Sequence, residues 1–123
     1  MTEYAILLPG DEAAWAGATP EQRQATYARH TEFAQALEAR GHKVVGGAEL
    51  THSSSARTVR STGGGHTVTD GPYAESVEQL SGFYLVESDD LDDLTEVVKI
   101  LADAEGGIEI RACVDHSQDG GTA

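Results

Sequence analysis

Two short apolar segments near the ends of the chain have the pattern of strands. Tyr4 to Leu8 is a continuous apolar run that Pro9-Gly10 ends, as expected for a buried strand. Residues 108–115 instead alternate between apolar and polar side chains, which predicts a strand with one face in water. The apolar set is Ile108, Ile110, Ala112 and Val114, and the other set is Glu109, Arg111, Cys113 and Asp115.

Capping signals predict two long helices. Thr19-Pro20-Glu21-Gln22 combines an N-cap, a proline at the first helical position and a capping box, and Gly41 marks the end of that helix. The second helix follows Asp89 or Asp90 and ends at Gly106-Gly107. Its core face is formed by Leu91, Leu94, Val98 and Leu101. Residues 11–17, which include Trp15, predict a short helical turn.

One histidine lies within the apolar stripe of the first helix. Helical spacing places His30 among Tyr27, Phe33, Ala34 and Leu37. A buried imidazole needs partners for its ring nitrogens, because an unpaired buried polar group costs about 1–3 kcal/mol. His30 is therefore either a core histidine or part of a functional site.

Further strands complete an alternating order of strands and helices. Residues 42–50 predict a strand that Gly46-Gly47 interrupts, by a bulge or a close backbone approach. Residues 57–62 and 66–70 predict a hairpin around three glycines, which are not followed by the Lys-Ser or Lys-Thr of a phosphate-binding loop. Another strand runs from Gly82 to Val86. The predicted fold is α+β, a split βαβ arrangement with an antiparallel sheet, helices on one face and an extra hairpin.

Composition narrows the class of protein. The 123 residues suit one domain, over residues 1–115, and the polar, Gly-rich residues 116–123 predict a flexible tail. The single Cys113 and the lack of a signal segment or a long apolar run predict a cytoplasmic protein that does not enter a membrane. The net charge of −13 argues against a nucleic-acid partner. The acidic cluster at residues 87–96 is interpreted as a solvated helix start, with an acidic docking face or cation site as the alternative.

A turn links the hairpin to the strand that follows it. Asp70-Gly71-Pro72 is a strong turn signal, and Tyr73 and a polar segment precede Gly82-Phe83-Tyr84. This stretch resembles the signature of the YCII-related family, in the branch named for an Asp-Gly-Pro-Phe (DGPF) motif. Tyr73 stands where that branch usually has Phe. The resemblance extends from Tyr4 to Val114.

The resemblance carries expectations about fold and function. It implies a ferredoxin-like chain that pairs with a second copy as a dimeric α+β barrel, sheet against sheet. It also implies that His30 and Asp70 form a facing pair. In such a pair the carboxylate would orient the imidazole, which would then move a proton on a bound small molecule without a metal or organic cofactor. One branch of the family eliminates HCl from a chlorinated hydroxylated aromatic.

Other residues near the turn are weaker candidates for contact with a ligand. Tyr73, Glu75, Glu78 and Ser81 follow Asp70, and His66 shares its strand face. The sequence has no nucleophile elbow and no paired histidines with zinc spacing, so no metal site is predicted. Two functions stay open: a small-molecule enzyme of the elimination or isomerisation type, and a non-catalytic dimeric module that binds a ligand or protein and has a regulatory role.

Overall fold

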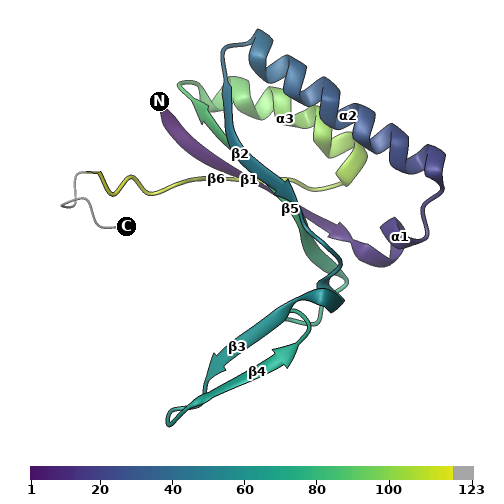
Figure 1. Ribbon diagram of the computed structural model, residues 1–123. Coiled ribbons are helices and arrows are strands. Elements are labelled where there is room, and N and C mark those ends of the chain that lie inside the picture. The colour runs from purple at the N-terminus through teal and green to yellow at the C-terminus, as the bar shows by residue number, and fades with distance from the viewer. Residues whose placement is uncertain (118–123) are drawn as a thin grey trace.

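A four-stranded antiparallel sheet carries two long helices on one face (Figure 1). The computed structural model describes residues 1–117. The strand order is β2-β5-β1-β6, and β3 and β4 pair separately as a two-stranded sheet. The strands are β1 (Thr2–Asp11), β2 (Lys43–Glu49), β3 (Arg57–Ser61), β4 (His66–Asp70), β5 (Glu78–Ser88) and β6 (Glu109–Ala112). The helices are α1 (Glu12–Ala16), α2 (Pro20–Ala39) and α3 (Leu91–Glu105), with a 3-10 turn, η1 (Ser53–Ser55). The mixed α+β class and the antiparallel sheet are confirmed.

The core lies between the sheet and the two long helices. Strand alternation turns Ile6 and Leu8 of β1 toward the helices, and α2 contributes Phe33 and Leu37. The remaining buried apolar residues are Val86, Leu94, Val97, Val98 and Leu101. One apolar layer therefore holds the helices against the sheet.

The predicted starts of the two long helices are confirmed. Thr19 caps α2 in a complete capping box with Gln22, and the Asp90 carboxylate accepts from the backbone of Asp93 at the start of α3. The prediction that Ala34 lies in the apolar stripe of α2 is wrong, because Ala34 is exposed. The buried stripe of α2 is narrow, so a position one step beyond Phe33 already faces water.

The predicted irregularity in β2 is a bulge at which two strands come close together. The register of β2 against β5 shifts between Val44 and Gly46. Gly47 follows with a φ of +146°, and a Cβ built on it would lie 2.6 Å from the carbonyl oxygen of Phe83. The close approach therefore requires a residue without a side chain at position 47.

The β3–β4 hairpin projects away from the rest of the chain (Figure 1). Val59 is 62% exposed and Val68 is 60% exposed, so neither strand is covered by the main core. The base of the hairpin is closed by a bond from Gly71 N to Ala56 O and by one from the Thr58 hydroxyl to Gly71 O. Asp70 stands at this base and is exposed.

Three strands differ from the prediction. β1 does not end at Pro9-Gly10 but continues to Asp11, with a shift in its register against β5 between Leu8 and Pro9. β5 begins at Glu78, four residues before Gly82, because it pairs with the far end of β1 up to Asp11. β6 covers only Glu109–Ala112, because its partner residues on β1 are limited to Tyr4–Leu7. Among the described residues, no helix is long and apolar enough to cross a membrane. Most of the predicted tail, residues 118–123, lies outside the described residues.

Replacing Gly47 should specifically damage the sheet. In Gly47→Ala the new Cβ meets the Phe83 carbonyl and the backbone stays in a left-handed conformation, so we expect a loss of about 1–3 kcal/mol in the free energy of unfolding. Urea denaturation followed by circular dichroism measures it. Gly64→Ala in the hairpin tip is the matched control, since nothing lies within 4 Å of its Cβ. Equal stability of the two variants would contradict the close approach.

Candidate functional site

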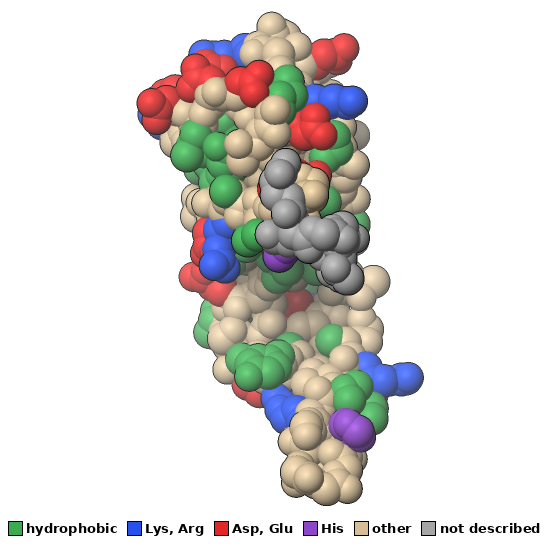
Figure 2. Space-filling model, turned by 90° about the vertical axis from the view of Figure 1, so that its left-hand side faces the viewer, with side chains coloured by type: hydrophobic (Ala, Val, Ile, Leu, Met, Phe, Trp, Pro, Cys, Tyr) green, Lys and Arg blue, Asp and Glu red, His purple; other side chains and the backbone are tan. Residues whose placement is uncertain are grey.

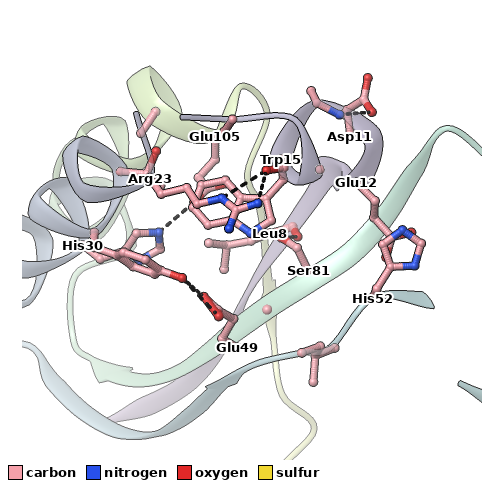
Figure 3. Close-up of a pocket in the computed structure, with 18 of the residues that line it drawn as sticks. Leu8, Asp11, Glu12, Trp15, Arg23, His30, Glu49, His52, Ser81 and Glu105 are labelled. Carbon is pink, nitrogen blue, oxygen red and sulfur yellow. Dashed lines mark hydrogen bonds and ion pairs between the residues drawn. The ribbon is translucent and has the colours of Figure 1, made fainter. Parts of the chain in front are cut away.

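A cleft of about 880 Å³ opens at one end of the main sheet. Its walls come from α1, the N-terminal half of α2, the last residues of α3, and the strand ends of β1, β2 and β5 (Figure 3). The size is typical of a site for a small organic molecule. The polar side chains that line it are Asp11, Glu12, Gln22, Arg23, Thr26, Tyr27, His30, Glu49, Thr51, His52, Ser81, Tyr84 and Glu105.

His30 sits in the cleft with both ring nitrogens bonded. Nδ1 lies 2.6 Å from the Tyr84 hydroxyl, and Nε2 lies 2.7 Å from Oε1 of Glu105. The His30 side chain is 20% exposed and that of Glu105 is 18% exposed. The His30 ring also stacks on the Tyr84 ring at a centroid distance of 5.8 Å. The imidazole is thus held between α3 and β5 while keeping contact with water.

The partners determine which nitrogen carries the proton in the neutral ring. A carboxylate oxygen only accepts, so His30 Nε2 donates to Glu105. Nδ1 is then left to accept from the Tyr84 hydroxyl. The result is a chain of donors from tyrosine to histidine to carboxylate, in which the carboxylate fixes the tautomer and stabilises a charged ring.

Tyr84 is kept in its neutral form. Burial raises the pKa of the Tyr84 phenol above its ordinary 10.0, and the nearby charge of Glu105 raises it further. The phenol also packs edge-on against Phe33 of the core at 5.2 Å between ring centroids. Tyr84 therefore presents a proton donor to His30 at neutral pH.

A second tyrosine and the only tryptophan form another wall. The Tyr27 hydroxyl donates to the Glu49 carboxylate at 2.9 Å, which raises the pKa of Tyr27. The Trp15 ring meets Tyr27 edge-on at 5.7 Å between centroids. Arg23 holds this part of α1 in place, since its guanidinium donates to the carbonyls of Trp15 and Ala16 and lies 5.3 Å from the indole centroid.

The opposite rim is built around Glu12. Its carboxylate accepts from both the backbone N–H and the hydroxyl of Ser53, each at 2.6 Å. Nε2 of His52 lies 3.4 Å from the same carboxylate. The bond from the Ser53 hydroxyl is the main reason that the pKa of Glu12 is lowered. Glu12 therefore stays ionised and ties α1 to η1.

The residues predicted from the sequence are spread over two places. His30 and Ser81 line the cleft, and the Ser81 hydroxyl donates to Leu8 O at 2.8 Å. The other candidates do not line it: Asp70, Tyr73, Glu75, Glu78 and His66. Tyr73 is 80% exposed and lies under the guanidinium of Arg60, on the hairpin side.

The facing pair of His30 and Asp70 does not form within one chain, which corrects the expected geometry. Both nitrogens of His30 are already bonded, to Tyr84 and Glu105. Asp70 belongs to β4, which pairs with β3 in a separate two-stranded sheet that leaves the main body after η1. The carboxylate that orients His30 is therefore Glu105.

Comparison with known proteins gives the family. The model of the YCII-related domain matches residues 2–116. The chain belongs to the YCII-related family. An uncharacterised protein of Rhizobium meliloti (strain 1021) is 32% identical over 111 residues, which cover 88% of this chain and 89% of that protein. The YCII-related domain thus includes the whole cleft and the hairpin.

Two residues of the site were missed in the sequence, although each left a signal. Glu105 is the last residue of α3, where the helix dipole disfavours a carboxylate, so an acid there indicates a specific partner. Tyr84 alternates with Val86 on the core face of β5, where a phenol needs a hydrogen-bond partner. His30 also needs a hydrogen-bond partner, and the bond between its Nδ1 and the Tyr84 hydroxyl gives both residues one.

A second histidine cluster is structural. His42 bonds the Ser88 hydroxyl at 2.8 Å through Nδ1 and Asp93 at 2.7 Å through Nε2. Ser88 is only 1% exposed and its hydroxyl also donates to Asp90 O, so no substrate can reach it. Within residues 1–117, no three potential metal ligands gather in one place.

The raised pKa of Tyr84 can be tested directly. In Glu105→Gln the neighbouring charge is lost while the burial remains, so the pKa of Tyr84 should fall but stay above 10.0. NMR titration of ring-labelled tyrosines, assigned with Tyr84→Phe, measures it. Glu49→Gln is the control, because it should lower the pKa of Tyr27 and leave that of Tyr84 unchanged. Titration of Tyr84 at its ordinary value in the unmodified protein would disprove the arrangement.

Proposed function

We propose that this YCII-related protein is a small-molecule enzyme that transfers a proton in the cleft without a cofactor, in an elimination or isomerisation. The observation that carries the proposal is the bonded chain of Tyr84, His30 and Glu105 in a water-reachable cleft. A histidine oriented by a carboxylate is a common general base, and its partner hydroxyl supplies a route to the ligand.

The proton path follows from the tautomer. As the Tyr84 oxygen takes a proton from the ligand, the Tyr84 hydroxyl passes its own proton to Nδ1 of His30. The imidazolium that forms is stabilised by Glu105 through Nε2. No free phenolate is needed, which suits a phenol whose pKa is raised. The deprotonated ligand then expels a leaving group or is reprotonated at another atom.

The turnover test rests on three variants. His30→Gln and Tyr84→Phe should each lower turnover about 10²–10⁴-fold, the usual contribution of a positioned acid or base. Glu105→Gln should lower turnover less and change its pH profile, because it acts through His30. A panel of small amines, organic acids, lactones and halogenated phenols in deuterated water, followed by NMR, detects both exchange and conversion.

Asp70→Asn separates this proposal from the pairing expected from the sequence. Asp70 does not line the cleft in one chain, so the variant should keep turnover. Loss of turnover in Asp70→Asn together with full turnover in His30→Gln would move the site to the hairpin. Melting temperatures of all four variants show whether each one is folded.

We also propose that the chain forms a homodimer through the sheet face opposite the helices. Leu7 and Phe83 are paired across β1 and β5, and Ala5 is paired with Leu85 next to them. All four alternate with core residues and are only half-buried in one chain. The strand order β2-β5-β1-β6 supports a ferredoxin-like chain that pairs as a dimeric barrel, and the turn Asp70-Gly71-Pro72 supports the DGPF branch.

The projecting hairpin gives a second reason for a dimer. It carries Arg57 and Arg60, while the chain as a whole has a net charge of −13. Figure 2 shows Lys or Arg side chains on the lower, projecting part of the molecule. An arm with two arginines, one aspartate and exposed Val59 and Val68 would be complementary to the acidic body of a second copy.

Sedimentation velocity tests the dimer. Leu85→Glu should convert dimer to monomer, because it places a carboxylate in the apolar face. Ala34→Glu adds the same charge on the exposed side of α2 and should stay dimeric. If the unmodified protein is a monomer at high concentration, the dimeric barrel is contradicted. The alternative function, a dimeric regulatory module that binds a ligand or protein, is then contradicted as well.

A further inference from the structure

The charges of the cleft indicate which ligands it accepts. Carboxylates of Asp11, Glu12, Glu49 and Glu105 line it, against one guanidinium, that of Arg23. The four carboxylates outnumber the guanidinium and the two imidazoles, His30 and His52, even if both rings are protonated. The whole chain adds to this field with its net charge of −13. A ligand with a carboxylate or phosphate would enter against this potential.

Two carboxylates stand on opposite sides of the cleft, and each accepts hydrogen bonds from its neighbours. Glu12 has a lowered pKa because Ser53 donates two hydrogen bonds to it. Glu49 accepts from Tyr27, and its residue is exposed at the end of β2, on the opposite side of the cleft from Glu12 (Figure 3). The cleft therefore has a carboxylate held in place by hydrogen bonds on each side.

The guanidinium of Arg23 has a structural role in the cleft. Nε and Nη2 of Arg23 donate to the carbonyls of Trp15 and Ala16, at 3.0–3.3 Å. The guanidinium also lies over the indole. Arg23 thus closes the C-terminal end of α1, and those donors are turned away from a ligand.

Aromatic rings complete the surroundings. Trp15 and Tyr27 meet edge-on beside Glu49, and Tyr84 stands next to His30. Aromatic faces together with carboxylates are the usual means of recognising an organic ammonium group, through cation–π attraction and ion pairing. Apolar lining from Leu8, Ala14, Ala18 and Ala104 suits the uncharged part of such a ligand.

We propose that the cleft binds an organic cation, an amine with an aromatic or apolar body, with its ammonium group near Glu49 and the Trp15–Tyr27 pair. This inference rests on the proposed function only in that it names the ligand class of the same cleft. The proton removed through Tyr84 and His30 would then come from a cationic ligand, whose positive charge makes neighbouring protons more acidic.

The single tryptophan makes the test direct, because Trp15 lies in the cleft. Three probes of similar size are titrated against its fluorescence: 2-phenylethylamine, 2-phenylethanol and 3-phenylpropanoate. We expect the amine to bind most tightly and the carboxylate least tightly. The preference for the amine over the alcohol should shrink as salt is added.

Charge-removing variants locate the effect. Glu49→Gln should weaken binding of the amine about threefold to tenfold and leave the alcohol unchanged, as expected for a partly exposed ion pair. The amide oxygen still accepts from Tyr27, so the wall is kept. Glu38→Gln removes the same charge from an exposed site on α2 outside the cleft and should change neither affinity.

Three results would overturn the inference. They are tighter binding of 3-phenylpropanoate than of the amine, equal effects of Glu49→Gln and Glu38→Gln, and no fluorescence response to any probe at millimolar concentration. The outcome is independent of catalysis. If the protein binds the amine but His30→Gln does not lower turnover, the proposed reaction is contradicted and this inference is not. If the protein converts an anionic substrate in a reaction that needs His30, this inference is contradicted and the proposed reaction is not.

Discussion

The arrangement of the site depends on a polar link between α2, β5 and α3 at the edge of the apolar core. His30 of α2 reaches Tyr84 on β5 with one nitrogen and Glu105 at the end of α3 with the other. Leaving any of these groups unpaired when half-buried would cost about 1–3 kcal/mol, so the three elements are held in one relative position. Hydrophobic packing alone would tolerate small sliding of α2 over the sheet. The hydrogen bonds of His30 fix the position of α2 on the sheet.

The same link explains why the cleft lies where it does. Phe33 and Leu37, further along α2, are fully buried against the sheet and α3. Toward its N-terminus α2 diverges from the core, and Tyr27 is already 47% exposed. His30 stands at this boundary. The widening space is then roofed by α1, which Arg23 and Glu12 attach to α2 and η1.

Local chemistry was readable in the sequence, and long-range pairing was not. The capping box at Thr19, the N-cap at Asp90 and the hairpin between β3 and β4 follow from residues within a few positions of each other. The need of His30 for a partner was also predictable from its place in the helical stripe. The identity of that partner was not, because the chain offers 21 acidic residues and the bond to Glu105 spans 75 positions. The family resemblance favoured Asp70, whose strand turned out to belong to another sheet.

The Asp70-Gly71-Pro72 motif and the site around His30 therefore have different roles in the structure. Asp70-Gly71-Pro72 closes the base of the hairpin, where Gly71 has a φ of +110° and is bonded on both sides, to Ala56 and to Thr58. A turn this well determined needs no ligand to explain it within one chain. An exposed arm on such a base is suited to a contact outside its own body, and in the proposed dimer that contact would be with the second copy. The motif would then serve the assembly, and the residues around His30 the chemistry.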